Sequence, residues 1–165
     1  MPDAVDRLAQ LVRSITNNDH PKLSVITDGA NGLQTIASQL PFTPKSVLDW
    51  FHISMRVRYL EQIAKGLRVT SEPENAAKHK LTARIGKLRW CFWHGNAAKA
   101  ASRMREISTI CRSVAPQTPQ AADSLAQLGY RVRELVAYVK ANGGSTINYG
   151  KLYREGEPIS TAMAE

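Results

Sequence analysis

Residues 23–52 read LSVITDGANGLQTIASQLPFTPKSVLDWFH, and this stretch decides the fold. It contains two short β-like runs, at about 23–27 and 46–50, separated by a segment with apolar residues at helical spacing. A strand, a helix and a second strand in that order predict one βαβ unit with parallel strands and a right-handed crossover. The remaining periodic segments favour helix, so the fold class that we expect is mostly α with one βαβ unit.

Helices are predicted on both sides of this unit. Upstream, apolar residues recur with a helical period over 3–16, and Asp3 is a suitable N-cap. Downstream, successive apolar stripes predict a long helical region over 51–144. Within this region Gly95 is expected to end one helix and Asn96 to cap the next.

Other segments are predicted to interrupt the helices. Residues 71–75 are expected to form a loop, because Pro73 lies inside them. Residues 145–158 show no clear period and are expected to be irregular. The final segment, 159–165, has the composition of a helix start.

The composition is that of a globular protein with a basic excess. Hydrophobic residues make up 43% of the 165-residue chain, and charged residues 22%. The formal net charge is +8. A charge of this size favours a polyanionic partner, most often nucleic acid, although a basic surface can also serve solubility alone.

The two cysteines do not indicate a disulfide framework. Cys91 and Cys111 lie in segments predicted to be helical, and buried free thiols in a reducing compartment are the expected interpretation. A zinc site that adds His52 and His94 is conceivable, but the spacing matches no established ligand pattern. The N-terminus lacks the pattern of a signal peptide, and no apolar run approaches a membrane span, so we expect a cytoplasmic protein without a membrane partner.

Two aspartates follow the predicted strands. Polar groups at the carboxyl ends of parallel strands often form functional sites, and Asp28 would suit a divalent cation there. Without further context an ordinary Asp-Gly turn is the favoured explanation of Asp28, and Asp49 could simply cap the helix that begins near Phe51. His52 would then be an ordinary residue of the first helical turn.

Aromatic residues alternate with a base at 89–93. Arg89, Trp90 and Trp93 resemble surfaces that stack on exposed nucleobases. The commoner explanation is that the two tryptophans fill the core of a helical hairpin.

Taken together and in order, several strings resemble the DDE transposases of bacterial insertion sequences, most closely the Kra type. The resemblance runs from about residue 20 to residue 165, and it is specific because the motifs occur in order at suitable spacing. The strings are 25–33 (VITDGANGL), 47–56 (VLDWFHISMR), 64–67 (AKGL), 87–96 (KLRWCFWHGN), 147–150 (INYG) and 156–165 (GEPISTAMAE).

The resemblance implies a partial RNase H-like catalytic core with a large helical insertion. It divides the chain into core residues 1–50, an insertion over 51–144, and a loop with the start of the catalytic helix over 145–165. It matches Asp28 to the second catalytic Asp and Glu165 to the catalytic Glu. Asp49 and His52 match the Asp-x-x-His signature of Mutator-like relatives.

The resemblance also implies the chemistry and the partner. Carboxylates of this family hold Mg²⁺ or Mn²⁺ for DNA cleavage and strand transfer at transposon ends. The first catalytic Asp has no match here, so we expect the chain alone to be an incomplete enzyme that retains no metal. Candidate DNA contacts on the insertion are Arg56, Arg58, Arg84, Lys87, Arg89, Trp90 and Trp93.

A non-catalytic alternative uses the same basic helices. In that case the chain is a DNA-binding or regulatory protein derived from a transposase. Self-association and association with an intact transposase are the protein partnerships that we consider. A helical scaffold whose charge serves only solubility is the third interpretation.

Overall fold

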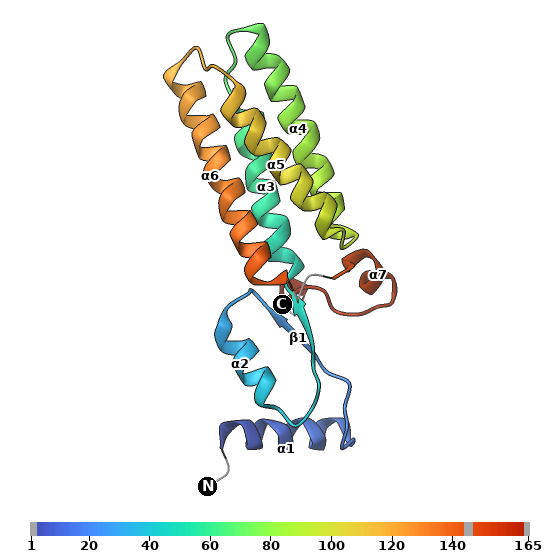
Figure 1. Ribbon diagram of the computed structural model, residues 1–165. Coiled ribbons are helices and arrows are strands. Elements are labelled where there is room, and N and C mark those ends of the chain that lie inside the picture. Colours follow the sequence, from blue (N-terminus) through green and yellow to red (C-terminus); the bar gives the residue numbers. More distant parts are fainter. Residues whose placement is uncertain (1–2, 144–146, 164–165) are drawn as a thin grey trace.

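The computed structural model of the chain describes residues 3–143 and 147–163. Four long helices run side by side, and a small part with two strands and two helices lies at one end of them (Figure 1). Within the described residues, no helix combines the length and the apolar character needed to cross a membrane. The elements in order are α1 (Ala4–Thr16), β1 (Ser24–Thr27), α2 (Asn31–Gln39), β2 (Lys45–Leu48), α3 (Trp50–Gly66), α4 (Glu72–Trp93), α5 (Ala97–Ser113), α6 (Pro119–Ala141), α7 (Tyr149–Arg154) and the 3₁₀ turn η2 (Thr161–Met163).

The strand pair confirms the predicted βαβ unit. β1 and β2 are parallel, and their register pairs Ser24 with Lys45 and Thr27 with Leu48. The backbone N–H of Asp49 continues the ladder by donating to the carbonyl of Thr27 at 2.8 Å. Both strands therefore end at the same edge, where the long helices begin.

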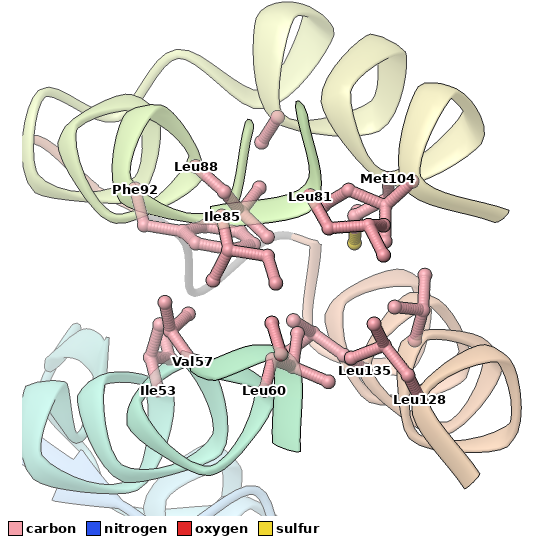
Figure 2. Close-up of a cluster of buried hydrophobic side chains, with 14 of the residues drawn as sticks. Ile53, Val57, Leu60, Leu81, Ile85, Leu88, Phe92, Met104, Leu128 and Leu135 are labelled. Carbon is pink, nitrogen blue, oxygen red and sulfur yellow. The ribbon is translucent and has the colours of Figure 1, made fainter. Parts of the chain in front are cut away.

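The four-helix part is held by a continuous apolar core. Each helix contributes one stripe of side chains at helical spacing, and these stripes face one another (Figure 2). Burial of each such side chain stabilises the fold by roughly 1.5–3 kcal/mol. The central members of the cluster are Ile53, Val57, Leu60, Leu81, Ile85, Leu88, Phe92, Met104, Leu128 and Leu135.

The structure corrects the predicted loop at 71–75. Ser71 is the N-cap of α4, and its hydroxyl accepts a hydrogen bond from the backbone N–H of Glu74. The Glu74 carboxylate in turn accepts a hydrogen bond from the backbone N–H of Ser71, which completes a capping box. Pro73 lies in the first helical turn, where its missing N–H costs no intrahelical bond, so it does not break the helix.

The C-terminal predictions were also wrong in part. Residues 145–158 were expected to be irregular, but α7 forms within them and is capped by the side chain of Asn148. The predicted helix start at 159–165 is a short 3₁₀ turn over Thr161–Met163. Glu165 lies outside the described residues.

A buried glutamate joins two loops at the end of the bundle distant from the strands. The Glu74 carboxylate accepts from the backbone N–H of Thr70 at 2.8 Å and from that of Gln117, in the α5–α6 loop, at 2.7 Å. These backbone donors, Gln117 first, lower the pKa of Glu74 to about 2. The ionised carboxylate therefore fixes the α3–α4 loop against the α5–α6 loop.

Glu74→Gln should lower the melting temperature at neutral pH, because the amide replaces one acceptor oxygen by a donor that faces the same N–H groups. The pKa of Glu74 is lowered from 4.5 to about 2, so its stabilising effect is complete above 4.5 and is lost as pH falls towards 2. Thermal unfolding measured from pH 7 to pH 2 should show that the difference in melting temperature between wild type and Glu74→Gln shrinks as the pH falls over that range. Glu72→Gln, an exposed neighbour, is the control. A difference that does not change with pH would contradict this role.

Candidate functional site

The carboxyl ends of the two strands place two aspartates at neighbouring positions. Asp28 and Asp49 directly follow Thr27 and Leu48, which are partners in the strand register. The Asp28 side chain is exposed, and one of its oxygens accepts from the backbone N–H of Ala30 at 2.9 Å. This bond makes the turn that the sequence predicted, while the carboxylate remains open to solvent.

Asp49 has a different environment. Its side chain is 1% exposed and accepts from the backbone N–H of Phe51 at 2.8 Å, which confirms the predicted N-cap of α3. Its other oxygen accepts from the hydroxyl of Thr161 at 2.6 Å and from the N–H of the same residue at 3.2 Å. Burial raises the pKa of Asp49, but hydrogen bonds from Thr161, Ser160 and Phe51 together hold it below its ordinary value. Asp49 therefore acts here as a buried structural anion.

The C-terminal segment is held at the strand ends by further hydrogen bonds. The backbone N–H of Trp50 donates to the carbonyl of Ile159 at 3.0 Å. The buried hydroxyl of Tyr149 donates to the carbonyl of Leu48 at 2.6 Å. Tyr149 and Ile159 are therefore held at the same edge of the strand pair as the exposed Asp28, although they are far from it in sequence.

The second predicted carboxylate cannot be placed in this site. Glu165 follows Thr161 by four residues and lies outside the described part of the chain. A cleft shared by Asp28 and Glu165 therefore stays a prediction.

An arginine-lined hollow begins beside the strand ends, between α3 and α6. It has a volume of about 260 Å³. The guanidinium of Arg56 lies over the ring of Tyr138, 4.2 Å from its centroid, and the Tyr138 hydroxyl donates to the carbonyl of Asp28 at 2.8 Å. This contact connects α6 to the end of β1. The lining residues are His52, Met55, Arg56, Tyr59, Arg131 and Glu134.

Arg131 is a residue of this hollow that the sequence interpretation missed. It donates to Glu134 at 2.6 Å and lies over the ring of Tyr59. Its helical position was clear from the sequence, but nothing local indicated that α6 would lie against α3. The pairing of two helices separated by more than 50 residues depends on the tertiary fold.

The other basic residues predicted to contact DNA differ in whether an acidic side chain pairs with them. Arg84 is within 2.6 Å of the Glu106 carboxylate, which also pairs with Arg103. Its charge is therefore offset by a neighbour on α5. The three remaining basic candidates, Arg58, Lys87 and Arg89, have exposed side chains.

The aromatic candidates form a second hollow at the end of α4. It has a volume of about 430 Å³ and is lined by Trp50, Arg89, Trp90 and Trp93. The expectation that both tryptophans fill the core is wrong for Trp90, which is 61% exposed. Trp93 is half-buried and packs against Trp50.

The described residues do not contain three His, Cys, Asp or Glu side chains grouped to hold a metal ion. The thiols of Cys91 and Cys111 are free and lie on α4 and α5. Asp28 offers an exposed carboxylate, a ligand type that suits Mg²⁺ and Mn²⁺. The oxygens of Asp49 are already occupied by three protein donors, so Asp28 fits the implied metal better than Asp49 does.

No protein family, curated protein or solved structure was found to match this chain.

Asp49→Ala should destabilise the fold by about 1–3 kcal/mol, because it removes a helix cap and leaves part-buried donors without their acceptor. The same substitution should release the C-terminal segment. Urea unfolding measures the first effect, and amide hydrogen exchange at 159–161 measures the second. Asp19→Ala, in an exposed loop, is the matched control. Equal stability and equal exchange in the two variants would rule out this anchoring role.

Proposed function

We propose that this chain is part of the catalytic domain of a DDE-type DNA transposase, of which it supplies Asp28 and Glu165. The parent reaction is metal-dependent DNA cleavage and strand transfer. The observation that carries the proposal is the return of the C-terminal segment, through Thr161 and Asp49, to the strand ends beside the exposed Asp28. Thr161, four residues before Glu165 in the sequence, thus lies at the part of the fold where the proposal needs a second carboxylate.

The residues have separate roles in this proposal. Asp28 contributes an open carboxylate, while Asp49 is a positioning residue that holds the last segment. Asp28 and Glu165 would hold the divalent cations of this reaction, which would supply activation of the attacking oxygen and stabilisation of the leaving oxygen of a phosphodiester. The protein contributes by holding the carboxylates and the DNA backbone in place. His52 and Arg56 line the hollow that begins next to this edge.

A second candidate function is DNA binding without catalysis, as in a regulatory derivative of a transposase. The α3–α6 hollow favours it, because the exposed guanidinium of Arg56 suits phosphate and needs no metal, whereas Arg131 is already paired with Glu134. Both functions share a DNA-binding surface. They differ in whether Asp28 contributes to metal chemistry.

Arg56→Gln should weaken duplex DNA binding, whereas Arg84→Gln should have a smaller effect because Glu106 already offsets the charge of Arg84. Binding should fall steeply as salt rises from about 50 to 200 mM, and each phosphate that the variant no longer neutralises should reduce the salt slope by about 0.9. Fluorescence anisotropy of a labelled duplex at several salt concentrations measures both quantities. Equal slopes for the two variants would show that the hollow does not bind phosphate.

The same DNA, incubated with the chain and Mg²⁺ or Mn²⁺, should remain uncut, because Asp28 and Glu165 are two of the three carboxylates that the reaction uses. Asp28→Ala is the control. Nicking that Asp28→Ala abolishes would show a complete metal centre within the chain. Absence of DNA binding even at low salt would contradict both proposed functions.

A further inference from the structure

The hollow at the end of α4 has no part in metal chemistry or in the arginine-lined contact. Three tryptophans and one arginine line its volume of about 430 Å³. A cavity of this kind, with aromatic walls and one charged group, is typical of a site for a small planar ligand.

Trp90 forms the accessible wall. Its side chain is 61% exposed, and its ring stacks on the ring of His94 at 5.8 Å with an angle of 17°. Stacking on His94 supports the indole while most of its surface remains in water. The exposed face of the indole is therefore available for stacking by a planar ligand.

The inner wall is fixed by packing. Trp50 and Trp93 meet edge to face, with ring centroids 5.0 Å apart. Trp93 also lies directly over Gly150, where an added Cβ would come within 2.5 Å of the indole Nε1. Gly150 therefore allows α7 to approach closely enough to hold Trp93. A preformed wall reduces the entropy lost when a ligand enters.

Arg89 decides between classes of planar ligand. Its exposed guanidinium lines the hollow, so an aromatic cage for a cationic ligand is disfavoured by like charge. A planar ring attached to an anion fits the combination of indole surface and guanidinium. Lys87, also exposed on α4, and the net charge of +8 add to the attraction for a phosphate chain.

We propose that this hollow binds a single unpaired base of a DNA strand, stacked on Trp90, with the adjoining phosphate at Arg89. The inference rests on the proposed function only in taking DNA as the nucleic acid. Trp50 directly follows Asp49, so the base site adjoins the strand ends. A strand with one base in the hollow would have its neighbouring phosphates beside that edge.

The test compares three DNA duplexes: one fully paired, one with a single unpaired adenine, and one with an abasic site at the same position. Base stacking on an aromatic side chain contributes about 1–3 kcal/mol, so wild type should bind the unpaired adenine roughly 5–150-fold more tightly than the abasic site. Trp90→Ala should abolish this preference and keep binding to the paired duplex. Tyr130→Ala, which removes another exposed aromatic ring on α6, should keep the preference.

A fluorescent base analogue at the unpaired position supplies an independent readout. Its emission should be quenched on binding to wild type, and it should not be quenched by Trp90→Ala. A base preference that survives in Trp90→Ala, or paired-duplex binding without any preference in wild type, would overturn the inference and leave the proposed function intact. Trp90-dependent binding of a proline-rich peptide, with no base preference, would assign the hollow to a protein partner instead.

Discussion

The arrangement of this molecule depends on one buried carboxylate, that of Asp49. It lies where β2 ends and α3 begins, and it accepts hydrogen bonds from the first turn of α3 and from Thr161. A buried carboxylate without such donors would cost several kcal/mol, so burial and bonding require each other. One side chain thus fixes the position of the strand pair, the long helices and the C-terminal segment relative to each other.

The two hollows that we propose as DNA contacts both include residues from the start of α3, next to this junction. The arginine-lined hollow begins at His52, in the first turn of α3, and the aromatic hollow includes Trp50 at the start of the same helix. Glu74 ties the loops at the distant end of the bundle, so α3 is anchored at both ends. We infer that this rigidity serves to hold both surfaces in a constant relation to the strand ends.

Local features were predictable from the sequence, and contacts between distant segments were not. The strands and the Asp49 cap follow from short-range patterns, and the structure confirms them. The start of α4 was missed because Pro73 was weighed without the capping box around it. The bond of Asp49 to Thr161 joins residues 112 positions apart, and the contact of Arg84 with Glu106 needs α4 against α5. Neither leaves a periodic signal in the sequence.

In the proposed function, Glu165 and Asp28 share one cation site at the strand ends. Substoichiometric Mn²⁺ broadens the amide NMR signals of residues near even a weakly occupied cation site. Signals from residues 28–30 and 163–165 should therefore broaden together at the same Mn²⁺ concentration, and both effects should disappear in Asp28→Asn. Broadening of only one of these two groups would contradict a shared cation site. Broadening of residues 163–165 that persists in Asp28→Asn would contradict it as well.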